Sequence, residues 1–132
     1  MAIEVLPDGW PRPKGYANAI LAEGRTLYIA GQIGWDENER LVGEDFLAQA
    51  AQALRNIAAL LKAAGAAPEH LVRMTWYVTD KGAYIAARKE LGQAYRDILG
   101  SNFPAMTAVE VKALMARGAL VEIECTACIP TG

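Results

Sequence analysis

The stretch that decides the fold reads Phe103-Pro104-Ala105-Met106-Thr107-Ala108-Val109-Glu110-Val111. It comes directly after a helical pattern that Gly100-Ser101-Asn102 closes, and it begins a strand that we expect from Met106 to Leu114. Because side chains alternate between the two faces of a strand, Met106, Ala108 and Glu110 should share one face of a sheet. The most informative residue of the stretch is Met106, whose thioether is a weak acceptor and carries no charge.

On both sides of this stretch, the hydrophobic pattern predicts two helices and four further strands. One helix runs from about Glu44 to Ala64 and the other from about Ala83 to Leu99, each with apolar residues at helical spacing. The strands are Tyr16 to Ala22, Thr26 to Ile33, Leu71 to Thr79 and Leu120 to Ile129, the first two joined by the turn Glu23-Gly24-Arg25. The order β-β-α-β-α-β-β predicts an α+β fold in which a single mixed sheet carries two helices on one face.

The strand patterns give this sheet a second face of mixed polarity. In the strand from Leu71 to Thr79, we assign Val72, Met74, Trp76 and Val78 to the helix side. The opposite face should hold the remaining alternate residues, namely Arg73, Thr75, Tyr77, Glu122 and Glu124, and we place Met106 and Ala108 there as well. Such a face is either solvated or an oligomer interface lined with pockets, and its aromatic and apolar members favour self-association.

Length and composition describe one ordinary domain, residues 1–132. Hydrophobic residues make up 53% of the chain, which is enough for a core, and the formal net charge is -2. This balance excludes the basic footprint of a nucleic-acid-binding protein. The N-terminal residues resemble neither a signal nor a transit peptide, and no apolar run approaches the roughly 20 residues that span a bilayer. We therefore expect a cytoplasmic protein with neither a nucleic-acid nor a membrane partner.

Two cysteines, Cys125 and Cys128, form a C-x-x-C near the end of the chain. Along a strand this spacing puts the two thiols on opposite faces. The single histidine, His70, leaves a zinc site short of ligands. We interpret the cysteines as reduced, packed thiols and expect no metal and no other cofactor.

Five short segments resemble motifs of the Rid family (YjgF/RidA-type, also called endoribonuclease L-PSP), in the family's order and at about its spacing. They are Gly15-Tyr16-Ala17-Asn18-Ala19, Ala30-Gly31-Gln32-Ile33, Thr75-Trp76-Tyr77-Val78-Thr79-Asp80, Phe103-Pro104-Ala105 with Val109-Glu110-Val111, and Val121-Glu122-Ile123-Glu124-Cys125. Each is weak alone, whereas five in order are specific. The resemblance implies a chorismate-mutase-like subunit in a homotrimer, with a central barrel and three small-molecule clefts between subunits.

The resemblance also assigns roles within such a cleft. It implies that Tyr16 and the backbone around Gly31 bind substrate, and that Glu122 positions the attacking water. Met106 stands where the deaminating members carry the arginine that holds the substrate carboxylate. Four further cleft positions depart from the family pattern: Ala30 replaces a serine, Trp35 follows a glycine that replaces a proline, Gly92 replaces a helix asparagine, and Ala108 replaces a cysteine or threonine.

These residues predict cofactor-free chemistry on a small metabolite. A glutamate in a partly buried cleft suits general acid/base catalysis, so Glu122 is our candidate for the hydrolysis of a carbon–nitrogen double bond. Because Met106 cannot bind a carboxylate, we expect an imine, an enamine or a related metabolite other than the usual 2-imino acids. Arg12, Lys14 or Arg73 could supply the missing cation instead.

Two other functions stay open at this point. The chain could form a trimer that binds metabolites in the same clefts without turning them over. Members of the family have also been called ribonucleases and translation inhibitors, and the acidic balance of this chain makes that the weakest interpretation.

Overall fold

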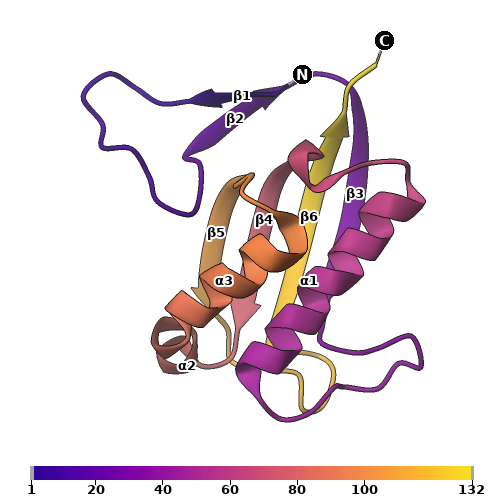
Figure 1. Cartoon of the computed structure of the whole chain (residues 1–132). Coiled ribbons are helices and arrows are strands. Elements are labelled where there is room, and N and C mark those ends of the chain that lie inside the picture. Colours follow the sequence, from indigo (N-terminus) through magenta and orange to yellow (C-terminus); the bar gives the residue numbers. More distant parts are fainter. Residues whose placement is uncertain (1, 132) are drawn as a thin grey trace.

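The computed structural model describes residues 2–131, which form two layers (Figure 1). The main sheet contains, in order across it, β3 (Arg25–Gln32), β6 (Val121–Ile129), β4 (Leu71–Val78) and β5 (Ala105–Glu110). β4 and β5 are parallel, whereas β6 is antiparallel to β3 and to β4. Helices α1 (Phe46–Ala63) and α3 (Arg88–Leu99) lie side by side on one face. The predicted α+β fold, with one mixed sheet and two helices on one face, is confirmed.

The core lies between these two helices and the sheet. The apolar stripe of α1 is fully buried there, at Ala50, Leu54, Ile57 and Leu61. The helix begins at Phe46 because the Asp45 carboxylate accepts a hydrogen bond from the Ala48 amide (2.9 Å) and so caps the first turn. The predicted start at Glu44 is therefore two residues early.

A single polar side chain of α1, Gln49, is fully buried in this core. Its Nε2 donates hydrogen bonds to the carbonyls of Gly43 (2.8 Å) and Gly118 (3.0 Å), and its Oε1 accepts one from the Leu120 amide (2.9 Å). Gly34 leaves the space for it, because a Cβ at that position would lie 2.5 Å from Gln49 Cα. Gln49 therefore ties the loop after β3, the start of α1 and the start of β6 to one another.

The second predicted helix, from Ala83 to Leu99, is two helices. A short helix α2 (Lys81–Ala86) ends at Ala87, where the backbone leaves helical geometry (φ -96°, ψ 6°), and α3 begins at the next residue. The break turns α2 away from the axis of α3 (Figure 1). Tyr84 of α2 then packs edge-on against the rings of Phe46 and Trp76, so that α2 closes one end of the core.

The two strands predicted on either side of Glu23-Gly24-Arg25 form, but their predicted place in a single sheet is wrong. β2 (Ala19–Ala22) pairs with β1 (Ala2–Val5) in a separate two-stranded sheet and does not pair with β3. At Gly24 (φ +147°) the chain passes so close to the end of β6 that a Cβ would lie 2.9 Å from the carbonyl carbon of Ile129. This turn sends β2 away from β3. The two strands β1 and β2, which we call the β1–β2 arm, consequently lie outside the main sheet (Figure 1).

Two local departures follow from strand pairing. β5 ends at Glu110, four residues before the predicted Leu114, because its partner β4 ends at Val78. In β4 the alternation assigns Val72 to the helix side, but a bulge between Leu71 and Arg73 shifts the register there. Leu71 takes the buried position and Val72 is only half-buried.

Candidate functional site at two sheet edges

Glu122 and Gly31 lie against each other on the open face of the sheet, meaning the face that no helix covers. Glu122 is half-buried and pairs in register with Tyr77 of β4. A Cβ built on Gly31 would overlap the Glu122 carboxylate, since it would lie 2.7 Å from Cδ. Gly31 occupies a bulge of β3 between Ile29 and Gln32, and a bulge re-aims the chain locally. The structure therefore brings together these two predicted site residues.

Two other predicted residues lie at the same β3 edge. Ala30 precedes Gly31 and is exposed on the open face, where it lines a shallow hollow with Arg73 and Thr75. Trp35 lies in the loop after β3, and its carbonyl accepts a hydrogen bond from Asn56 Nδ2 (2.9 Å). We call Ala30, Gly31, Trp35 and Glu122 the Glu122 half-site.

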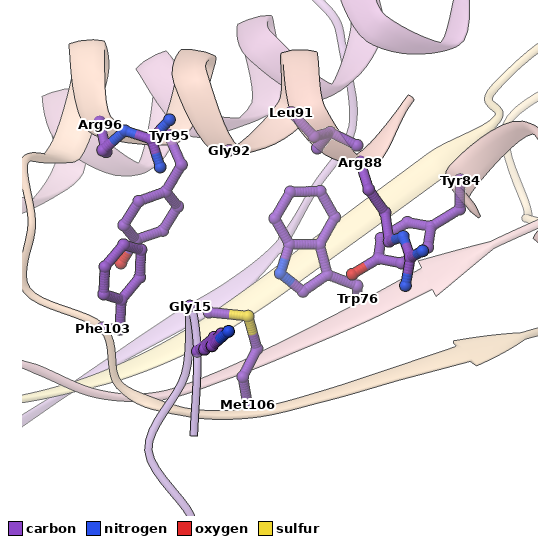
Figure 2. A pocket seen from close by; sticks show the side chains of 11 residues that line it. Gly15, Trp76, Tyr84, Arg88, Leu91, Gly92, Tyr95, Arg96, Phe103 and Met106 are labelled. Atoms are coloured by element: carbon purple, nitrogen blue, oxygen red, sulfur yellow. The ribbon is translucent and has the colours of Figure 1, made fainter. Parts of the chain in front are cut away.

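The remaining predicted residues gather at the opposite edge, along β5. Tyr16, Met106 and Ala108 line a hollow of about 220 Å³. Tyr16 is held there because the Ala17 amide donates to the Pro104 carbonyl (3.0 Å) and Ala17 pairs with the first residue of β5. A second cavity of about 260 Å³ continues from this hollow beneath α3, where Gly92 lines it (Figure 2). We call Tyr16, Gly92, Met106 and Ala108 the Met106 half-site.

Met106 lies on the helix side of the sheet, so its predicted place on the open face is wrong, and the same correction applies to Ala108. β5 runs parallel to β4, with Met106 opposite the buried Met74 and Ala108 opposite Trp76. Residues opposite each other share a face. Figure 2 shows the Met106 side chain directed toward Trp76 beneath α3. The residues of β5 alone could not reveal this, because both of its faces carry apolar and polar side chains.

The two half-sites do not meet within one chain. β3 and β5 are the two edges of the four-stranded sheet, with β6 and β4 between them. Glu122 and Ala30 lie on the open face, whereas Met106 and Ala108 face the helix side. A reaction that needs both half-sites would therefore require a second copy of the chain.

The three candidate cations are placed differently. Lys14 lines both the β5 hollow and the cavity beneath α3. Arg12 is largely exposed and lies 3.8 Å from the Glu4 carboxylate in the β1–β2 arm. Arg73 faces the hollow on the open face. Of the three, only Lys14 lies at the Met106 half-site.

Three residues of the cavity beneath α3 escaped the sequence analysis as site residues: Trp76, Arg88 and Arg96 (Figure 2). Both arginines belong to α3, one four residues before Gly92 and the other four residues after it. Arg88, Gly92 and Arg96 therefore share one face of the helix. That spacing was a usable signal. Trp76 gave none, because a tryptophan at an inward strand position is an ordinary core residue.

Two acidic residues near the half-sites have structural partners. Glu124, two residues beyond Glu122, accepts a hydrogen bond from the Tyr77 hydroxyl (2.5 Å), and this bond raises the pKa of Tyr77. Glu110 accepts from the Lys81 amide at the start of α2 (2.7 Å). These contacts give both glutamates structural roles and distinguish them from Glu122.

The cysteines are free, and they do face opposite ways along β6. Cys125 is buried, and burial raises the pKa of its thiol to about 12, whereas Cys128 is half-buried. His70 Nδ1 accepts a hydrogen bond from the Ala67 amide (3.0 Å), which gives it a structural role. Among residues 2–131, no three histidine, cysteine, aspartate or glutamate side chains cluster where they could hold a metal ion. In the same part of the chain, every helix is too short or too polar to cross a membrane.

Comparisons with known proteins agree with this architecture. The family model described as endoribonuclease L-PSP matches residues 11–129. Human 2-iminobutanoate/2-iminopropanoate deaminase is 37% identical over 113 residues, which are 85% of this chain and 78% of that protein. A RutC family protein of Synechocystis is 35% identical over 123 residues, 92% of each chain.

Solved structures give the same result. A Rid family protein of unknown function from Yersinia pestis has a TM-score of 0.84 and 37% identity, and the match covers 97% of this chain and 98% of that one. RidA from an Antarctic Psychrobacter has a TM-score of 0.69 and 36% identity over 88% and 89% of the two chains. Fold and sequence together define a small α+β protein of the YjgF type. The chain belongs to the Rid family, as its five motifs predicted.

Proposed function

We propose that this chain is a cofactor-free hydrolase of an imine or enamine other than the usual 2-imino acids, with Glu122 as its general acid/base. The observation that carries the proposal is the packing of the Glu122 carboxylate against Gly31, which leaves no space for a Cβ. A glycine at that position keeps the carboxylate in place beside the backbone. The human relative named 2-iminobutanoate/2-iminopropanoate deaminase supports the reaction class.

The chemistry needs one carboxylate and one water. Glu122 accepts a proton from the water while the water oxygen bonds to the imine carbon, and the carbon–nitrogen double bond becomes single. The protonated carboxyl then returns the proton to nitrogen, which gives a carbinolamine. The same carboxylate next transfers the hydroxyl proton of the carbinolamine to nitrogen, so that the carbon–nitrogen bond breaks and ammonia leaves as the carbonyl forms. Glu124 is less suited to this part, because its Oε1 already accepts a hydrogen bond from the Tyr77 hydroxyl.

The proposal includes a homotrimer, because the two half-sites lie at opposite edges of one sheet. A second copy that placed its β3 edge beside this chain's β5 edge would bring its Glu122 toward Met106. Exposed apolar side chains on the open face, Tyr28 (80%) and Val109 (41%), support such burial. Light scattering should give the mass of a trimer. A monomer at micromolar concentration would contradict this part of the proposal.

Met106 limits the substrate. At this position the family resemblance implies the arginine that holds the carboxylate of a 2-imino acid, and a thioether offers no charge. The substrate group that contacts Met106 is therefore apolar. Tyr16, which is 42% exposed at the same hollow, can stack on a planar substrate or donate a hydrogen bond to it.

The test is ammonia release from freshly generated imines, namely 2-iminopropionate and the aldimines of benzaldehyde and 3-carboxybenzaldehyde. Glu122→Gln should lower turnover of the preferred imine by about 10²–10⁴-fold, the usual contribution of general acid/base catalysis. Glu124→Gln is the matched control on the same strand and face, and it should keep turnover near that of the wild type. Equal rates for wild type and Glu122→Gln would overturn the catalytic role. Saturable binding of these compounds without turnover would favour the metabolite-binding function instead.

A further inference from the structure

The cavity beneath α3 is a space between this helix and the sheet that no side chain of the described residues fills. Its volume of about 260 Å³ corresponds to roughly nine molecules of liquid water and lies just below the range of small-molecule pockets. It shares Lys14, Gly15, Tyr84 and Met106 with the β5 hollow, so the two form one continuous groove. Figure 2 shows its walls: Trp76 and Met106 from the sheet, and α3 above them.

Trp76 has an unused hydrogen-bond donor in this cavity. The residue is 3% exposed, and its Nε1 is the buried side-chain polar atom without a partner in the part of the chain that the structure describes. A buried indole N–H normally has a partner. In Figure 2 the nitrogen is directed into the cavity, toward the side of Met106 and Phe103. The described residues therefore leave this N–H without an acceptor on the side of the groove.

The charge around the cavity is positive. Arg88, Arg96 and Lys14 line it, and none of the lining residues is acidic. Within residues 2–131, neither arginine forms an ion pair with a carboxylate, and Arg96 makes one long hydrogen bond, to Gln93 (3.4 Å). The Arg96 guanidinium lies over Gly92, where a Cβ would be in ordinary contact with its Nη1 at 3.5 Å. The acceptor that suits this environment is an anion.

We propose that this cavity is the acid-binding subsite of the enzyme, in which Trp76 Nε1–H and the Arg96 guanidinium bind a substrate carboxylate that is separated from the reacting carbon by an aromatic ring or a short apolar chain. The inference rests on the proposed function, because it places the reacting carbon at Met106 and Ala108 in the mouth of the groove. The apolar linker then lies along Met106 and Phe103. A 2-imino acid is too short for both contacts, since its carboxylate is bonded directly to the imine carbon.

The experiment measures binding of three probes to the full chain: 3-phenylpropionate, its uncharged amide, and pyruvate. Calorimetry gives the affinities, and the indole N–H signals in a nitrogen–proton NMR spectrum report on each tryptophan, with Trp76→Phe used for assignment. We expect 3-phenylpropionate to shift the Trp76 signal while those of Trp10 and Trp35 stay in place. It should also bind at least about tenfold more tightly than the amide and than pyruvate.

Arg96→Gln should weaken 3-phenylpropionate binding by about tenfold or more and leave the affinity for the amide unchanged. Arg55→Gln, an exposed arginine on α1, is the matched control and should bind as the wild type does. An unmoved Trp76 signal at saturating 3-phenylpropionate would overturn the proposal, as would equal affinity of Arg96→Gln and wild type. Failure of the subsite leaves the dependence of ammonia release on Glu122 intact, whereas failure of the proposed function leaves carboxylate binding intact, so the two failures are distinguishable.

Discussion

The two half-sites differ in what fills them. In the Glu122 half-site, a carboxylate packs directly against backbone, and a single added carbon would displace it. In the Met106 half-site, an apolar wall and basic side chains surround about 260 Å³ of space. The first holds one group in place for a reaction, whereas the second leaves room for a ligand. In this interpretation the reaction class depends on β3 and β6, and the choice of substrate depends on β5 and α3.

The strongest way to break this comparison is Gly31→Ala. The added Cβ would overlap the Glu122 carboxylate, which must then rotate away from the backbone. We expect turnover of the preferred imine to fall by at least about 100-fold, as for loss of the general base itself. The free energy of unfolding should change little, because a half-buried side chain can move. Turnover by Gly31→Ala equal to that of the wild type would show that the position of the carboxylate is unimportant.

The next test separates the stability of the fold from the activity of the site. Gln49→Ala removes three buried hydrogen bonds that tie the loop after β3 to α1 and β6. Buried groups left without partners should lower the free energy of unfolding by about 2–3 kcal/mol, measured by urea denaturation. Gln93→Ala, an exposed control on α3, should lower it by less than about 0.5 kcal/mol. Because the hydrogen-bond partners of Gln49 belong to neither half-site, the turnover of the folded Gln49→Ala protein should match that of the wild type.

Met106→Arg sharpens the comparison at the other half-site. The new guanidinium would supply the carboxylate contact of 2-imino acids and would occupy the mouth of the groove. We expect turnover of 2-iminopropionate to rise by about tenfold, while binding of 3-phenylpropionate weakens by a similar factor. Met106→Leu has similar volume and no charge, so both quantities should stay close to those of the wild type. If both variants behave alike, charge at position 106 does not select the substrate.

The last test compares the two faces of β6, which directs Glu122 to the open face and Cys125 into the core. Burial raises the pKa of the Cys125 thiol from 9.0 to about 12. Because the pKa is raised in the folded state, the neutral buried thiol contributes its full stabilisation below about pH 9. That stabilisation is lost as the pH rises toward 12. Between these values the unfolding free energy of the wild type should fall more steeply than that of Cys125→Ala, by about 1 kcal/mol per pH unit. If the unfolding free energies of the wild type and of Cys125→Ala fell in parallel over this pH range, the prediction for the Cys125 thiol would be contradicted.

The sequence was sufficient for the layers of the fold because its periodic signals were long. The stripe of α1 and the alternation of β6 each span several repeats, and each predicted the correct buried face. The ends and directions of strands that depend on a neighbouring strand could not be predicted from the strand's own residues. The end of β5 is set by the end of β4, and the direction of β2 is set by the close passage of Gly24 past Ile129.

The candidate site was predictable in its members and only partly in its arrangement. Family motifs identified both half-sites, but the face of Met106 depends on its pairing with Met74 across a parallel edge. The bulge at Gly31, which sets it against Glu122, left no sign beyond the glycine itself. The buried position of Gln49 did have a signal in the sequence, because it is a polar residue three positions after Phe46 in the apolar stripe of α1.

The β1–β2 arm also has a consequence for hydrogen exchange. Its two strands have four residues each, pair only with each other in the described part of the chain, and leave Ile3 (53%) and Leu21 (66%) exposed. An isolated two-stranded hairpin is marginally stable in water. Amide protection in the arm of a single chain should therefore be orders of magnitude lower than in β4 and β6. Protection that grew with protein concentration would mean that a neighbouring copy covers the arm, which would turn these amides into local reporters of assembly.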